Sequence, residues 1–190
     1  IQSGAARLFP LEVLGSHVGP APAHSTGRAQ CMDFRGAIAL FGHMGVEADV
    51  RHLNTDDHNN LKRWVGHYKA WRDVIHRGTY SQGKTANGVW WLVQTNAQCI
   101  LNVITTRAPD TPHHAPVRLA PFSDQGLWRV RLLGKAGLER ARGSATSLWL
   151  DALSGDGVVM SGAEIASVGL PVPNMNPESA LVLTFERVSQ

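Results

Sequence analysis

The chain has few of the features that would tie it to a membrane, to nucleic acid or to an oxidising compartment. It has only two cysteines among 190 residues, Cys31 and Cys99, which lie far apart among apolar neighbours. Two buried, reduced thiols are therefore favoured over a disulfide, as is usual in the cytoplasm. There is no run of about 18 apolar residues and no basic segment leading into an apolar one, so neither a membrane span nor a signal peptide is predicted. The net charge of +3 comes from 18 basic and 15 acidic residues scattered along the chain, which argues against a nucleic-acid surface.

The sequence also lacks the motifs of common metal sites and of serine hydrolases. Its nine histidines include His58, His67 and His76, which recur every nine residues. Nine residues are about 2.5 helical turns, so successive members would point to opposite sides of a helix and could not share an ion. His113 and His114 are adjacent, but they have no second ligand pair. Neither a His-Glu-x-x-His nor a Gly-x-Ser-x-Gly string is present, and we predict no metal and no cofactor.

Residues up to Gly78 alternate between strand and helix patterns. Arg7–Phe9 and Val46–Val50 are predicted as short strands, and Met32–Phe41 as a short amphipathic helix. Asn54–Asp57 is a strong helix start, with a capping side chain followed by two acids. The helix that it opens carries apolar residues at three- and four-residue steps, namely Leu61, Trp64, Val65, Tyr68, Trp71 and Ile75. Alternation of this kind predicts two parallel βα units, which are too few to close a barrel of eight.

After residue 80 the pattern becomes that of short strands separated by turn residues. The predicted strands are Val89–Val93, Ile100–Thr106, Val117–Leu119, Trp128–Leu133, Ser147–Leu150 and Ala180–Glu186. Trp128–Leu132 alternates apolar and polar residues, which is typical of a strand with one wet face. The fold class predicted is therefore α/β followed by all-β, with an antiparallel sandwich in the second part.

Several sequence blocks resemble the α-galactosidases of glycoside hydrolase family 36. The blocks are Leu14–Pro20, His24–Arg28, Phe41–Glu47, Met160–Gly162, Val168–Leu170 and Asn176–Ala180. The resemblance implies that residues 1–80 are the last two βα units of a (β/α)₈ barrel, and that residues 81–190 are the C-terminal β-sandwich domain. It also implies a parent enzyme, bacterial and cytoplasmic, that removes α-linked galactose from oligosaccharides such as raffinose or melibiose with retention and without a cofactor.

The same resemblance implies that the catalytic carboxylates lie elsewhere. The family's nucleophile belongs to a Lys-x-Asp-x-Asn segment and its acid/base is a further Asp, both upstream of the matched blocks; no Lys-x-Asp-x-Asn string occurs here. The chain begins at Ile1 rather than Met, so we expect a C-terminal piece of a longer enzyme that is inactive alone. Its expected partners are α-galactosides through the complete enzyme, and either the missing N-terminal barrel or a second copy of the chain. An apolar patch around Phe9, Val46 and Trp64 is expected at the open barrel edge.

The residues nearest a substrate should follow the first barrel strand of the chain, because barrel active sites form at the carboxyl ends of the strands. If that strand lies within Leu8–Leu14, the loop after it presents Ser16, His17 and His24 to the sugar. Glu47 and Asp49 are the best catalytic pair within the chain, two residues apart on a predicted strand. A structural role for them, in ion pairs with Arg28, Arg35 or Arg51, is the favoured interpretation.

A different class of function is also compatible with the sequence. The second part contains Trp90, Trp91, Trp128 and Trp149, and exposed indole rings are common platforms for sugars. The alternative is therefore a non-catalytic carbohydrate-binding or interaction module, which requires exposed tryptophans or a groove on the β domain. Because Trp90 and Trp91 are adjacent on a strand, they should face opposite sides of the sheet, and core packing is favoured for most of the four.

Overall fold

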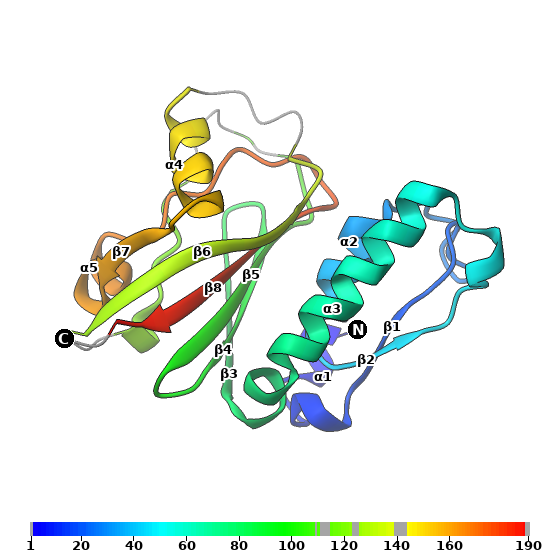
Figure 1. Cartoon of the computed structure of the whole chain (residues 1–190), viewed down its shortest axis with the longest axis horizontal. Helices are drawn as coiled ribbons and strands as arrows, with labels where there is room; N and C mark the ends of the chain where they lie inside the picture. Colours follow the sequence, from blue (N-terminus) through cyan, green and yellow to red (C-terminus); the bar gives the residue numbers. More distant parts are fainter. Residues whose placement is uncertain (1, 109, 111–114, 123–125, 139–143, 189–190) are drawn as a thin grey trace.

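The computed structural model describes residues 2–108, 110, 115–122, 126–138 and 144–188. Helices α2 (Met32–Ala39) and α3 (Thr55–Arg77) lie between two sheets (Figure 1). The smaller sheet is the parallel pair β1 (Gly15–Val18) and β2 (His43–Val46). The larger is a six-stranded antiparallel sheet. The predicted order, α/β followed by antiparallel β, is confirmed.

The first strand does not lie where the sequence placed it. Arg7–Phe9 form a turn after the short helix α1 (Gln2–Ala5), with Leu8 and Phe9 exposed. A 3₁₀ turn, η1 (Leu11–Val13), then leads into β1. Only two of the four residues of β1, Ser16 and Val18, are buried, so the strand has no apolar signature of its own. The second strand likewise lies earlier than predicted, because β2 ends at Val46 and a second 3₁₀ turn, η2 (Val50–His52), follows.

The long helix α3 confirms the prediction made from its ends and its apolar face. The Asn54 side chain accepts a hydrogen bond of 2.8 Å from the Asp57 backbone N–H, which satisfies one of the unpaired donors of the first turn. Asp56 and Asp57 face the positive end of the helix dipole, and His76 and Arg77 the negative end. The buried face is formed by Leu61, Trp64, Val74 and Ile75.

The antiparallel strands are arranged in the order β3-β4-β5-β8-β6-β7. Their bounds are β3 Thr79–Lys84, β4 Gly88–Gln94, β5 Gln98–Thr105, β6 Leu127–Ala136, β7 Val158–Ser161 and β8 Ser179–Arg187. Four of the predicted strands are confirmed as β4, β5, β6 and β8. In the described residues these strands form one continuous sheet rather than two hydrogen-bonded sheets, with packed side chains on both of its faces.

Two predicted strands are different structures. Ser147–Leu150 lies inside helix α4 (Ser144–Ser154), where Trp149, Leu150 and Leu153 reach the core at helical spacing. Val117–Leu119 contributes only an isolated bridge, from Val117 to Leu170. A short η3 turn (Ala120–Phe122) follows it, and helix α5 (Gly162–Ser167) begins with a reciprocal cap between Ser161 and Glu164.

Strand β5 shows how the sheet separates two cores. Cys99, Leu101 and Val103 point into the core beneath α4 and α5. Ile100 and Ile104 point to the other side, into the core formed with α2 and α3. Asn102 points to the same side and donates a 2.9 Å hydrogen bond from Nδ2 to the Ala37 carbonyl near the end of α2. The sheet and the helices of the first part therefore share one core.

The two cysteines lie in different surroundings. Neither cysteine forms a disulfide; Cys99 is buried as predicted, whereas Cys31, expected to be buried, is exposed just before α2. Within the described ranges, none of the helices combines the length and the apolar character that a membrane span needs.

Candidate functional site

The parallel pair β1–β2 has one covered and one open face. In its register Ser16 lies beside Met44 and Val18 beside Val46. Ser16 and Val18 are buried, and Met44 packs against the clusters that include residues of α2 and α3. On the other face His17 lies beside Gly45. Among the described residues no element covers this second face, which in a closed barrel would be the interior.

His17 is held on the open face by its neighbours. Its imidazole ring lies over Gly45 across the strand pair and beside Gly15 on its own strand, and a Cβ on Gly45 would overlap the ring. Glycine is required there because the ring takes the place of a side chain. Nδ1 of His17 is 3.8 Å from Oε2 of Glu47, and both side chains are at least half exposed. This pair is screened by water and orients the ring more than it stabilises the fold.

The other two residues that the sequence proposed for the sugar pocket behave differently. Ser16 is buried on the helix face, where it accepts a hydrogen bond from the Gln2 amide and donates a long one, 3.5 Å, to the Ile38 carbonyl. It lies on the opposite side of β1 from His17. His24 lies in an exposed turn and makes no polar contact with another described residue.

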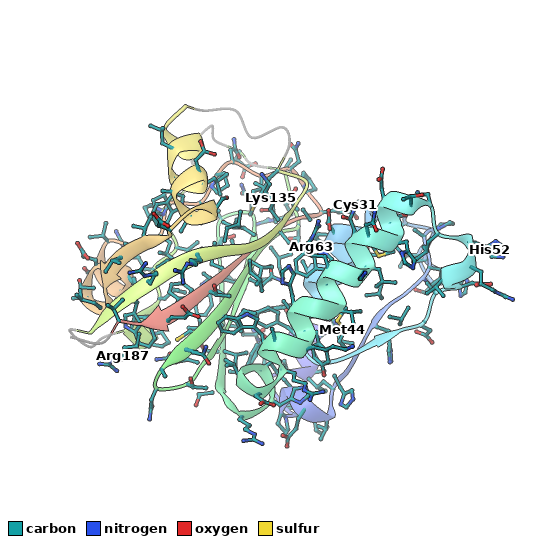
Figure 2. The ribbon with its side chains drawn as sticks, in the orientation of Figure 1. Cys31, Met44, His52, Arg63, Lys135 and Arg187 are labelled. Atoms are coloured by element: carbon teal, nitrogen blue, oxygen red, sulfur yellow. The ribbon has the colours of Figure 1, made fainter. Side chains whose placement is uncertain are left out.

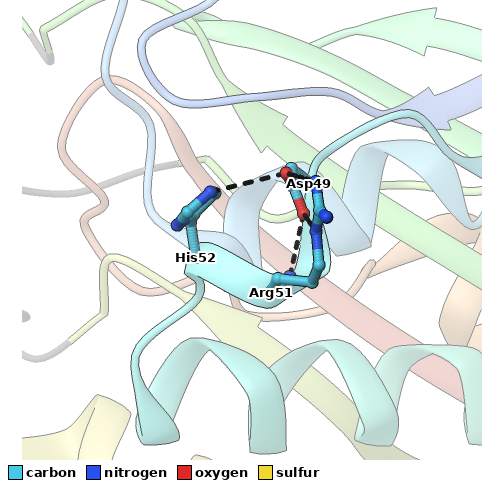
Figure 3. Close-up of polar contacts among 3 residues, drawn as sticks. All are labelled: Asp49, Arg51 and His52. Carbon is cyan, nitrogen blue, oxygen red and sulfur yellow. Dashed lines mark hydrogen bonds and ion pairs between the residues drawn. The ribbon is translucent and has the colours of Figure 1, made fainter.

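Glu47 and Asp49 do not form the predicted pair on one strand face. Both follow the end of β2, so strand alternation does not orient them. Asp49 begins η2 and accepts bonds from the Arg51 backbone N–H (3.0 Å) and from its Nε (2.9 Å) and Nη2 (2.7 Å) (Figure 3). These bonds lower the pKa of Asp49 to about 2. The ion pair with Arg51 that the structural interpretation anticipated is therefore present.

Two further polar residues organise the strand ends, and sequence reasoning gave them no such role. Arg35 on α2 donates a 2.7 Å bond from Nη1 to the Gly19 carbonyl, which ties the loop after β1 to the helix. Asp33, also on α2, accepts from Arg63 Nη2 (2.6 Å) and from Trp64 Nε1 (2.8 Å) on α3, with Arg63 on the α2 side of that helix (Figure 2). These contacts join segments distant in sequence, and no local spacing signals them.

The expected apolar patch is only partly present. Phe9 and Val46 are 55% and 42% exposed, in agreement with an open edge. Trp64 is fully buried instead, because its indole ring packs against Gly36 of α2 and Gly134 of β6. Apolar exposure also continues onto the outer surface of the first part, where a groove is lined by Val50, Leu61, Val65 and the stems of Lys62 and Lys69.

The described residues contain no group of three histidines, cysteines or acids close enough to hold a metal ion. His67 is half-buried against Trp64, with its ring edge-on at 5.5 Å, whereas His58 is exposed. His76 contacts Tyr68 and stacks on His43. The three histidines of α3 thus have separate surroundings, and His113 and His114 lie outside the described residues.

The described fold is a parallel strand pair backed by two helices and followed by an antiparallel sheet. Residues 1–78 match the family model described as Melibiase. The chain is 30% identical to an α-galactosidase of Escherichia coli, over 98% of this chain and 27% of that protein. It is 26% identical to the bifunctional α-galactosidase/sucrose kinase AgaSK of Mediterraneibacter gnavus, over 94% of this chain and 17% of the relative. Over nearly its whole length the chain therefore matches the C-terminal portion of α-galactosidases of glycoside hydrolase family 36.

Solved structures show the same fold. The galactosidase domain of AgaSK superposes with a TM-score of 0.78 at 21% identity, over 98% of this chain and 24% of that one. The α-galactosidase AgaA of Geobacillus stearothermophilus in complex with raffinose gives 0.78 at 20% identity, over 98% of this chain and 24% of that one. The chain therefore spans between 17% and 27% of the length of these relatives.

Proposed function

We propose that this chain is the C-terminal portion of an enzyme that hydrolyses terminal α-galactosides in oligosaccharides with retention of configuration. Residues 1–80 supply the last two βα units of its barrel, and residues 81–190 its C-terminal β domain. The observation that carries the proposal is similarity to α-galactosidases along nearly the whole chain, at 30% identity with the Escherichia coli protein. The parallel strand pair with one uncovered face supports it.

Within this enzyme, the open face of β1–β2 forms part of the pocket wall. His17 is the proposed sugar contact, because its half-exposed ring stands on that face and Glu47 orients it. His24 is proposed at the rim, on its exposed turn. Ser16 is not proposed as a sugar contact, because its hydroxyl is buried beneath α2.

The two catalytic carboxyl groups come from outside the chain in this proposal. A retaining glycosidase needs a nucleophile and an acid/base about 5 Å apart, and the acid must be protonated at working pH. Asp49 does not suit the second role, because its bonds to Arg51 keep it ionised. Glu47 lies beyond the end of β2, and its ion-pair contact among the described residues is with His17. The isolated chain is therefore proposed to be inactive, and the enzyme to need no cofactor.

The missing barrel is the proposed partner of the exposed apolar surface. Leu8, Phe9, Val13, Val46 and Val50 are all well exposed on the first part of the chain. Such exposure is more than a lone domain of this size needs, and burial against the rest of a barrel accounts for it. Self-association of two copies is the competing outcome. Cys31 and Cys99 form no disulfide, which supports the expected cytoplasmic location.

A chimeric enzyme tests the proposal. The C-terminal quarter of the Escherichia coli relative is replaced by this chain, and galactose release from raffinose is measured beside the truncated relative without any replacement. We expect the truncated protein to be inactive and the chimera to regain activity. In the chimera, His17→Ala should lower kcat/KM about tenfold or more, as loss of a hydrogen bond to a substrate hydroxyl does.

The matched control in this experiment is His58→Ala, at an exposed position on α3. It should leave kcat/KM unchanged. Equal activity of the chimera and of its His17→Ala variant would contradict the assignment of His17, and a well-folded but inactive chimera would contradict the assignment of the chain.

A further inference from the structure

We propose a second sugar-binding site, on the face of the antiparallel sheet opposite α2 and α3. A cavity of about 280 Å³ opens there between the β3–β4 turn, the end of β5 and the segment 115–118. Its lining includes Trp90, Val103, Thr105, Val117 and Met175. The site lies in the β domain, goes beyond the proposed hydrolysis and needs no residue from outside this chain.

Trp90 forms an apolar wall of this cavity. It pairs with Gly83 of β3 and Val103 of β5, and its indole ring lies over Gly83, where a Cβ would overlap it. The ring is partly exposed, and its N–H has no hydrogen-bond partner among the described residues. In contrast, the indole N–H groups of Trp64 and Trp91 donate to Asp33 and Ser3. Trp90 thus offers an apolar ring together with an unused donor.

Thr105 supplies a hydroxyl at the wall of the cavity. It is only 2% exposed, and it lines the cavity from the last position of β5, on the same strand face as Val103. No hydrogen bond joins its hydroxyl to another described residue, whereas that of Ser179 on the neighbouring strand donates to the Gly137 carbonyl. The Thr105 hydroxyl is not one of the enclosed, unsatisfied groups of the fold, so it is open to the cavity and can donate to, or accept from, a polar group inside it.

The size and the mixed chemistry of the cavity fit one pyranose ring. The volume lies just below the usual range of small-molecule pockets, about 300–1,000 Å³, so a ligand of one ring is appropriate. A pyranose presents C–H groups to an indole face and hydroxyls to surrounding polar groups. A purely apolar ligand would leave the Thr105 hydroxyl and the Trp90 N–H unpaired. The lining contains Lys84 and Arg118 but no carboxylate, so it differs from a glycosidase catalytic site.

The site can be tested on the chain itself by nuclear magnetic resonance. The chain has six tryptophans, and each gives one indole N–H signal in a ¹⁵N spectrum. The signal that disappears in Trp90→Phe belongs to Trp90. On titration with raffinose we expect this signal to move saturably, with a dissociation constant in the millimolar range, while that of Trp64 stays in place.

Threonine variants distinguish a ligand contact from a structural role. Thr105→Val keeps the shape and removes the hydroxyl, so we expect raffinose binding to weaken about threefold to tenfold while the unfolding midpoint is kept or raised. Thr184→Val is the matched control. Thr184 is also buried in the sheet, but it lies opposite Ile100 in the strand register, on the face that packs against the helices. It should leave raffinose binding unchanged.

The outcomes separate this site from the proposed catalytic pocket. His17→Ala should not alter the titration of the Trp90 signal. Absence of a saturable shift at Trp90 would overturn the proposal. The proposal would also be overturned if the Thr105→Val variant bound raffinose as well as the unmodified chain does, or if it unfolded much more readily without any loss of binding.

Discussion

A few close neighbours determine the pKa values of single side chains in this fold. Asp49 lies at the surface, yet its pKa falls to about 2 because Arg51 donates side-chain and backbone hydrogen bonds to it. His67 is affected in the opposite way: burial beside Trp64, and then the charge of Arg63, lower the pKa of its imidazole from 6.5. The Asp49 carboxyl therefore favours its charged form and the His67 imidazole its neutral form, which suits a structural role for each residue.

His67 should make the chain sensitive to mild acid. Above pH 6.5 the histidine is neutral in both the folded and the unfolded chain, so it contributes no pH dependence. Below that pH the unfolded chain binds the proton first, so the free energy of unfolding falls as the pH drops through the lowered pKa. Urea unfolding at pH about 7.5 and about 5.5 measures this loss. It should be smaller in His67→Leu and unchanged in His58→Gln, and an equal loss in all three would contradict the explanation.

At the scale of elements, the contact between α2 and α3 decides how the first part is built. Gly36 of α2 has no side chain because the Trp64 ring of α3 occupies that space. Trp64 also donates to Asp33, so one indole provides both packing and a hydrogen bond between the helices. The same ring reaches Gly134 of β6 and connects the helices to the sheet. This contact positions β1 and β2 on the β domain.

Two helical glycines should therefore respond in opposite ways to alanine. Gly36→Ala should destabilise the chain by about 1–3 kcal/mol, since the added methyl overpacks against Trp64. Gly66→Ala should stabilise it by up to about 1 kcal/mol, because nothing lies near the new methyl on the exposed face of α3 and alanine favours helix. Urea unfolding compares the two, and a stabilising Gly36→Ala would disprove the described packing.

The cap of α3 gives a separate prediction. Asn54→Ala removes the acceptor for the Asp57 N–H and should cost about 1 kcal/mol. Asn59→Ala, at an exposed position inside the same helix, should cost nothing. Equal losses at the two positions would mean that the cap bond is not what stabilises this helix end.

Prediction from sequence succeeded where the signal is local. The cap of Asn54 and the periodic apolar face specify α3, and the runs of β4, β5 and β8 are apolar enough to identify. It failed for β1, since Gly15–Val18 contains a single aliphatic residue and pairs with a strand far along the chain. The placement of Glu47 and Asp49 depended on a strand that ends three residues before Asp49.

Tertiary contacts account for the remaining differences. The burial of Trp64 depends on glycines in two other elements, and no spacing within α3 reveals it. The cavity at Trp90 requires β3, which the sequence left unassigned, and the place of Thr105 in its wall is visible only in the fold. The sequence places His17 near the substrate because it follows a predicted barrel strand, but its separation from Ser16 follows from strand alternation within β1 as the structure defines it.

The whole molecule is held together by the core between the sheet and the helices. Phe34, Trp64 and Ile75 from the first part pack there with Ile100 and Val182 from the sheet. We expect one unfolding transition, with tryptophan fluorescence and far-ultraviolet circular dichroism coinciding, because neither part keeps this core without the other. Two separate transitions would show that the parts fold independently across the proposed division at residues 80 and 81.

The central claim is that the chain contributes walls and support to an α-galactosidase but neither of its catalytic carboxylates. The most direct test measures nitrophenol release from nitrophenyl α-galactoside by the purified chain, beside its Glu47→Gln and Asp49→Asn variants. The account predicts no release above the uncatalysed rate from any of the three. Release by the unmodified chain that is lost in Glu47→Gln or Asp49→Asn would contradict it.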